Sequence, residues 1–219
     1  MFPFPFSFIS GAAPDVPVDR IANAEAMSFN GTDQYVSAGN ITSLNNLSAF
    51  STSSWINYSG TPSGTSHVFL SGGSGASNRF YIELVGSTTI RYGSGPGYDD
   101  VAVSSISSGS WHHIVTVHDG TSLDVYLDGV KQNPSSVLVT SPNTSIGQSF
   151  KIGSYFSPVG FLWSGKLDEV ALFNTALSAS KIQQIYDATA VVGGVPQTAN
   201  LFTGGLSSSL VYWNRMGDS

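Results

Sequence analysis

The chain has 219 residues, a formal net charge of −6 and no cysteine. The missing cysteine excludes disulfides and thiolate metal sites, and the lack of adjacent Lys or Arg residues argues against nucleic acid as a partner. The chain has no run of about 18 apolar residues, so the sequence predicts no membrane span. Only 10% of the residues are charged and 24 are Gly, which favours a β-rich protein over long helices.

Residues 1–24 are predicted to form an apolar N-terminal arm and linker. Pro residues alternate with Phe in its first part, which favours an extended segment over the helix of a signal peptide. Exposed Phe side chains would adhere to other surfaces in water. We therefore expect the arm to dock onto a partner or to mediate self-association through Phe2, Phe4, Phe6 and Phe8.

The next part of the chain alternates short apolar segments with turns. Residues 27–29 and 35–38 flank a turn, and residues 50–58 form a long predicted strand around Trp55. Gly- and Ser-rich stretches separate the following segments. Further short strands are predicted at 68–70, 80–85, 88–92 and 101–103. Many short strands at this spacing indicate a β-sandwich or barrel.

Residues 111–129 are the most informative stretch. They contain two strands rich in Val, Ile and Leu, each followed by an Asp-Gly pair, at Asp119-Gly120 and at Asp128-Gly129. Asp and Gly tolerate the positive φ that hairpin turns require. The pattern predicts a hairpin with a second turn directly after it.

The C-terminal third contains the one convincing helix. A strong predicted strand at residues 165–173 precedes it. Ser178 is a plausible N-cap, and apolar residues at helical spacing predict a helix near 178–188. Residues 210–218 then form a predicted final strand.

Three blocks of this sequence resemble a known family. They are Phe29-x-Gly31-x-x-x-Tyr35-Val36, the stretch 111–129 that opens with Trp-His, and the strand 165–173 with the helix after it. Together they resemble the laminin-G/pentraxin-like domains of the concanavalin A-like lectin/glucanase superfamily. The resemblance implies an all-β, concanavalin A-like jelly-roll sandwich of two antiparallel sheets, spanning residues 25–219, with one short helix.

The last strand raises a question of connectivity. Many laminin-G-like domains begin with a strand that residues 210–218 resemble. We interpret 210–218 as a permuted strand that fills the vacant position in the sheet. The alternative is that it leads into a further domain.

The resemblance also bears on catalysis and metal binding. Glucanases of the superfamily use paired Glu residues on one strand, and this chain has Lys166 at the first position and only three Glu residues in all. We therefore predict that the protein is not an enzyme. Related domains bind calcium at loop carboxylates and carbonyls, which implies a candidate site at Asn30, Gly31, Asp33 and Asp168. The alternative is that Asn30, Gly31 and Asp33 only shape a turn and that Asp168 is an exposed strand residue.

Aromatic residues beside Gly-rich loops are candidates for sugar binding, because aromatic rings stack on sugar rings and loops commonly carry binding residues. The candidate ligand-binding residues are Tyr98, Trp163, Phe161 and Tyr92. The aromatic stretch 155–163 equally fits an intersubunit contact.

The low charge, the missing cysteine and the apolar arm resemble laminin-G-like proteins of marine tailed phages. This resemblance implies a non-enzymatic virion surface protein, in a capsid or a tail. Its arm would contact other virion proteins, and its lectin-like domain would attach to host-surface glycans. The alternatives are a purely structural capsid decoration or assembly protein, and a bacterial carbohydrate-binding module located outside the cell or at its surface.

Overall fold

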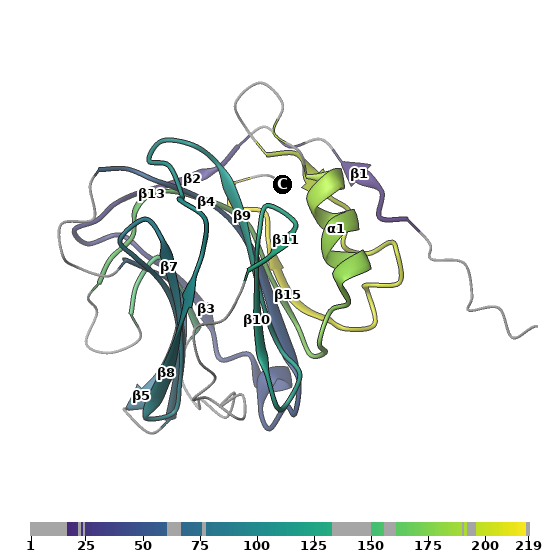
Figure 1. The fold of residues 1–219 in the computed structure, drawn as a ribbon, viewed down its shortest axis with the longest axis horizontal. Coiled ribbons are helices and arrows are strands. Elements are labelled where there is room, and N and C mark those ends of the chain that lie inside the picture. The colour runs from purple at the N-terminus through teal and green to yellow at the C-terminus, as the bar shows by residue number, and fades with distance from the viewer. Residues whose placement is uncertain are drawn as a thin grey trace, which may run out of the picture.

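The chain folds into a sandwich of two antiparallel sheets, as the sequence predicts. A computed structural model describes residues 17–21, 23, 25–60, 67–75, 78–132, 150–155, 161–189, 191 and 196–217. The two sheets face each other, and an α-helix lies on the outer side of one of them (Figure 1). None of the described helices is long and apolar enough to cross a membrane.

One sheet has seven strands. Its order is β11-β10-β9-β4-β13-β15, and β2 also pairs with β13. The strands are β2 (Met27–Asn30), β4 (Phe50–Tyr58), β9 (His112–His118), β10 (Leu123–Leu127), β11 (Val130–Lys131), β13 (Ser164–Phe173) and β15 (Leu210–Asn214). The hairpin predicted around Asp119-Gly120 is the β9–β10 pair, in which His118 lies opposite Leu123.

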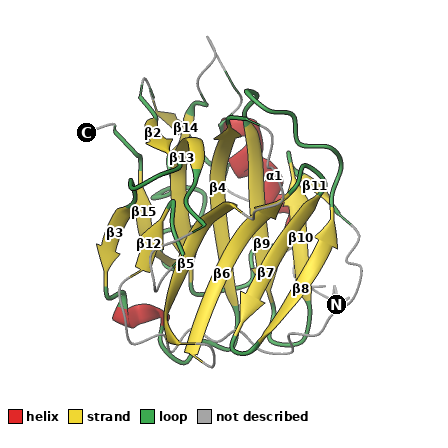
Figure 2. Ribbon diagram, turned by 90° about the vertical axis from the view of Figure 1, so that its left-hand side faces the viewer, coloured by secondary structure: helices red, strands yellow, loops and turns green. Residues whose placement is uncertain are grey.

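The other sheet has six strands, in the order β3-β12-β5-β6-β7-β8 (Figure 2). They are β3 (Val36–Gly39), β5 (His67–Gly75), β6 (Asn78–Val85), β7 (Thr89–Ser94), β8 (Gly97–Ala102) and β12 (Phe150–Ile152). Shorter elements are β1 (Arg20–Ile21), paired with β14 (Thr198–Ala199), and a 3-10 turn at Thr42–Leu44.

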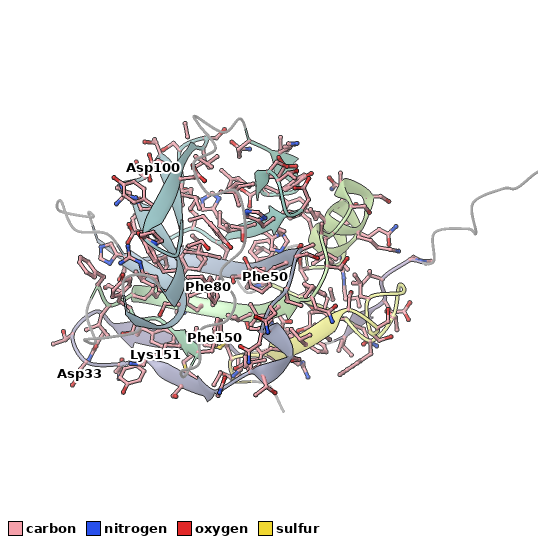
Figure 3. All side chains as sticks on the ribbon, turned by 90° about the horizontal axis from the view of Figure 1, so that it is seen from below. Asp33, Phe50, Phe80, Asp100, Phe150 and Lys151 are labelled. Atoms are coloured by element: carbon pink, nitrogen blue, oxygen red, sulfur yellow. The ribbon has the colours of Figure 1, made fainter. Side chains whose placement is uncertain are left out.

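The main core lies between the two sheets. Alternate residues of β6 point inward, and Phe80, Ile82 and Leu84 are fully buried there. The Phe80 ring meets the ring of Phe50 edge-on at 5.4 Å and stacks on Phe150 at 5.7 Å. Figure 3 shows these three rings close together in the interior. This aromatic layer joins β4 of one sheet to β6 and β12 of the other.

Strands from the two ends of the chain share one edge of β13. Residues 164–167 of β13 pair with β2, and residues 170–173 pair with β15. Between the two pairings the β13–β4 register shifts, and Glu169 has φ +49°. The C-terminal strand therefore lies in the sheet beside β2. Circular permutation as the origin of this arrangement stays a prediction.

The outer face of the seven-stranded sheet is covered by the helix. This helix, α1 (Ala179–Ala188), begins at Ser178, whose side chain accepts a hydrogen bond from the amide of Lys181. Ile182 and Ile185 are buried in a second apolar cluster that includes Val115 and Phe173. The prediction of a short helix near 178–188 is confirmed. The predicted docking residues Phe2, Phe4, Phe6 and Phe8 lie outside the described residues.

A histidine is buried under this helix. His113 stacks on Trp55 at 5.2 Å and on Tyr186 at 5.9 Å, and its Nε2 hydrogen-bonds with Ser53 Oγ at 2.8 Å. Burial lowers the pKa of His113 to about 4, although Asp128 opposes the shift. His113 is therefore neutral at physiological pH and serves packing.

Replacing Phe80 by Ala should lower the free energy of unfolding by about 3 to 5 kcal/mol, because the variant leaves a cavity between the sheets. Val130→Ala is the matched control, since Val130 is 63% exposed, and it should cost less than about 0.5 kcal/mol. Chemical denaturation measures both changes. Equal losses in the two variants would contradict the proposed core.

The buried His113 predicts a loss of stability in acid. Its pKa of about 4 lies below the ~6.5 of an unfolded histidine, so the unfolded chain binds the extra proton as the pH falls from ~6.5 to ~4. Stability should fall by about 3 kcal/mol across this window from His113 alone. Denaturation of His113→Gln at several pH values should show a shallower slope there than the wild type. Parallel slopes would refute the assignment.

Candidate functional site

The outer face of the six-stranded sheet is open. No described helix or strand crosses it in the view that faces this sheet (Figure 2). The inward positions of β6 are buried, so the residues between them point outward. The outward side chains of β6, β7 and β8 include six aromatic or charged ones, those of Arg79, Tyr81, Glu83, Arg91, Tyr98 and Asp100.

A groove on this face is lined by aromatic and charged side chains. It has a volume of about 270 Å³, and its lining residues are Arg79, Tyr81, Glu83, Arg91, Tyr155 and Phe161. Three of the rings form a row, in which Tyr155 meets Tyr81 edge-on at 5.3 Å and Phe161 at 5.7 Å. Phe161 ends the row and is 54% exposed. An apolar side chain this exposed is available for contact with a ligand.

The ring of Tyr81 covers a glycine of the neighbouring strand. Gly93 lies opposite Tyr81 in the β6–β7 register, and a Cβ at Gly93 would lie 2.0 Å from Cε1 of the ring. Only glycine leaves room for the ring in this position. Burial and the nearby Glu83 raise the pKa of Tyr81 to about 12, so its hydroxyl keeps its proton at physiological pH.

Arg91 contacts a further aromatic residue of this face, Tyr98. Its Nε and Nη2 donate to the two carboxylate oxygens of Asp100 at 2.6 and 2.8 Å, and its Nη1 donates to Glu83 at 3.1 Å. The guanidinium lies 4.2 Å from the centre of the Tyr98 ring. Hydrogen bonding to Asp100 raises the pKa of Arg91. Tyr98 is 44% exposed. Its ring therefore lies on the surface, where the fixed guanidinium of Arg91 holds it in place.

Arg79 lies in the groove with different partners. Its Nε donates to the carbonyl of Gly95 at 2.9 Å, and its Nη1 donates to the hydroxyl of Tyr155. Its guanidinium lies 5.3 Å from the centre of the Tyr81 ring. Three contacts therefore fix the position of this cation.

Two of the four predicted ligand-binding residues lie on this face, and two do not. Tyr98 and Phe161 are exposed there. Trp163 and Tyr92 are buried, so neither ring can stack on a sugar, and their selection was wrong. Trp163 packs edge-on against Phe69 at 5.8 Å, and Tyr92 occupies an inward position of β7 near His118. Nearby glycines suggested surface loops, whereas strand alternation and core packing turn both rings inward.

The predicted calcium ligands are not brought together. The Oδ1 of Asn30 accepts hydrogen bonds from the amides of Thr32 and Asp33, and Gly31 has φ +73°, as a tight turn requires. Asn30 lies opposite Ser164 on β13, whereas Asp168 lies four residues further along that strand.

Asp168 is fully buried and accepts a hydrogen bond from Asn23 Nδ2 at 2.9 Å, so the alternative of an exposed strand residue is wrong. Within the described part of the chain, no group of three or more His, Cys, Asp or Glu residues could hold a metal ion. Calcium binding at the Asn30–Asp33 turn stays a prediction.

Sequence reasoning missed Arg79, Tyr81, Arg91 and Tyr155. A signal for Arg79 and Tyr81 was present, because polar and apolar residues alternate through 79–84. Which residue of β7 lies beside each one depends on strand pairing, which the sequence does not state. Tyr155 joins the groove through the fold around β12, far from β6 in the sequence.

A second groove lies next to β15. It is lined by Ile21, Asn200, Phe202, Trp213, Asn214 and Arg215, with a volume of about 540 Å³. Phe202 is 67% exposed and meets Trp213 edge-on at 5.4 Å. This groove is apolar on one side and borders the edge of the seven-stranded sheet.

The sandwich and its open aromatic face define a lectin-like β-sandwich domain. The family model Laminin_G_3, described as the concanavalin A-like lectin/glucanases superfamily, matches residues 30–183. The chain belongs to this superfamily, as its three sequence blocks predict. A comparison with curated proteins finds no significant match.

Solved structures with this fold come from several sources. Domain 4 of AbnA, a GH43 extracellular arabinanase of Geobacillus stearothermophilus in complex with arabinotriose, is 19% identical, with a TM-score of 0.60 over 83% of this chain and 84% of that one. The CBM40 of the Ruminococcus gnavus IT-sialidase, bound to α2,3 sialyllactose, is 10% identical, with a TM-score of 0.59 over 74% and 97%. The enzymatically active domain of tailspike protein 2 of bacteriophage CBA120 is 13% identical, with a TM-score of 0.56 over 91% of this chain and 34% of that chain. At these identities the similarity establishes the fold.

Gly93→Ala should destabilise the protein by about 1 to 3 kcal/mol, because the new methyl group would overlap the Tyr81 ring. In a Tyr81→Ala background the same change should cost at least about 1 kcal/mol less, since the overlapping ring is gone. Denaturation of the two single variants and the double variant measures this coupling. Additive effects would contradict the packing of Tyr81 on Gly93.

Proposed function

We propose that this protein binds glycans through the outer face of the six-stranded sheet and has no catalytic activity. The observation that carries the proposal is the groove on this face, which is lined by aromatic rings and fixed charged groups and ends at the exposed Phe161. Sugar rings have apolar faces that pack on aromatic side chains and hydroxyls that need oriented hydrogen-bond partners. Tyr98 and Phe161 offer such rings at the two sides of the Arg79–Arg91 region.

The chemistry of the groove supports binding over hydrolysis. A glycosidase needs one carboxyl group as an acid and a second as a base or nucleophile. The two acidic side chains on this face, Glu83 and Asp100, are both paired with Arg91. On the opposite sheet, Glu169 is buried and bonded to Thr198 and Trp213. Glycan-bound relatives such as the arabinotriose complex of AbnA domain 4 also support a binding role.

The biological setting that we propose is the surface of a virion, where the domain attaches to host-surface glycans. Similarity to a phage tailspike and the phage-like style of the sequence support this setting. In this proposal the Phe-rich arm joins the domain to other virion proteins or to further copies of itself. An extracellular carbohydrate-binding module is the alternative setting for the same activity.

A structural assembly role is the second candidate function. The observation that favours it is the groove beside β15, where the exposed Phe202 lies against Trp213. An exposed aromatic next to an edge strand suits a protein contact. In a purely structural protein this groove would matter, and the face around Tyr98 would not.

Separate replacement of Tyr98 and Phe161 by Ala should weaken binding to a glycan-array hit by about 5- to 10-fold each, because each variant removes a stacking surface. Phe202→Ala is the matched control and should leave glycan affinity unchanged. Isothermal titration calorimetry with the best array ligand measures these changes. An array without any hit, together with altered self-association of Phe202→Ala, would favour the structural role instead.

A further inference from the structure

The two arginines of the groove differ in how their charge is balanced. Arg91 forms three hydrogen bonds to the carboxylates of Asp100 and Glu83. Arg79 donates only to a carbonyl, that of Gly95, and to the Tyr155 hydroxyl. Within the part of the chain that the structure describes, no carboxylate forms an ion pair with Arg79. Arg79 is therefore the one arginine of the groove without a carboxylate partner among the described residues.

The N–H donors of Arg79 that the protein leaves unused have a fixed orientation. A guanidinium has five N–H donors, and the protein uses two of those on Arg79, so both donors of Nη2 and one of Nη1 remain. Nη2 has no hydrogen-bond partner among the described residues and is not among the buried polar atoms that lack one, so solvent reaches this nitrogen. The contact with Tyr81 holds the plane of the guanidinium in place. A ligand would therefore meet a fixed cation rather than a flexible one.

We propose that this groove selects saccharides that carry a carboxylate, such as uronic or sialic acids, and that Arg79 binds the carboxylate group. The inference rests on the glycan-binding function proposed above. Guanidinium and carboxylate groups are matched in charge and planar geometry, and such charge-assisted hydrogen bonds are stronger than neutral ones. Glu83 does not compete for Arg79, because it is bound to Arg91.

The row of Tyr81, Tyr155 and Phe161 would position the part of the sugar that carries no carboxylate. Tyr155 accepts the hydrogen bond from Arg79 and contacts Phe161, so the cation and the exposed ring belong to one connected unit. A sugar stacked on Phe161 would direct its acidic substituent along this row toward Arg79. The protein as a whole carries a net charge of −6. Attraction of an anionic sugar to the groove would therefore come from Arg79 and not from the overall charge.

Calorimetric titrations with matched probes test the inference on the full chain. The probes are sialyllactose against lactose, and trigalacturonic acid against its methyl ester. At least one acidic probe should bind about tenfold more tightly than its neutral counterpart. That preference should shrink when NaCl is raised from about 50 to about 500 mM.

Three variants assign the preference to Arg79. Arg79→Gln should lose about tenfold in affinity for the acidic probe and leave the neutral probe within about twofold, whereas Arg79→Lys should be intermediate. Lys131→Gln is the control, because it makes the same charge change at a cation paired with Asp124 on the other sheet. It should leave both affinities unchanged. Circular dichroism and the melting temperature verify that each variant is folded, and Arg79→Lys serves alone if Arg79→Gln does not fold.

The outcomes separate this inference from the function on which it rests. Equal binding of acidic and neutral probes, or an unchanged preference in the Arg79 variants, would overturn carboxylate selection and leave glycan binding intact. Equal affinity for sulfated lactose and sialyllactose would likewise overturn selection of a carboxylate. A protein that binds no glycan, on the array or in these titrations, would overturn the proposed function itself.

Discussion

Burial of the Phe80 ring between Phe50 and Phe150 sets the register of β6, and much of the molecule follows from it. Because side chains alternate along a strand, fixing Phe80 inward also fixes Arg79 and Tyr81 outward. A slip of one residue would place charged groups in the core and phenyl rings in water. The free energy gained by burying the aromatic layer therefore also positions the polar groups of the outer face.

The two sheets use their outer faces differently. The seven-stranded sheet buries its outer face under α1, where neutral His113 forms a cluster with the rings of Trp55 and Tyr186. The six-stranded sheet leaves its outer face open in the described structure, and charged pairs and aromatic contacts hold the side chains there in place. A rigid, partly apolar and partly charged surface is what recognition of a small polar ligand requires, because little conformational entropy is lost on binding.

The sequence predicts the elements better than it predicts the site. The bounds predicted for the long strand, 50–58, are those of β4, and Ser178 caps the helix as expected. These features depend on local patterns of apolar and capping residues. Selection of exposed aromatics failed for Tyr92, because a nearby glycine does not reveal which way a strand residue points. The sequence likewise does not distinguish Arg79 from Arg91. Only the pairing of β6, β7 and β8 brings carboxylate partners to Arg91.

The most direct test of the account is the position of a bound oligosaccharide, determined by crystallography of the complex or by NMR chemical-shift mapping. The account predicts that the ligand lies on the outer face of the six-stranded sheet, in the groove lined by Arg79, Tyr81 and Phe161, with further contact to the exposed Tyr98 beside it. A ligand seated instead in the groove of Phe202 and Trp213, or at the Asn30–Asp33 turn, would contradict it.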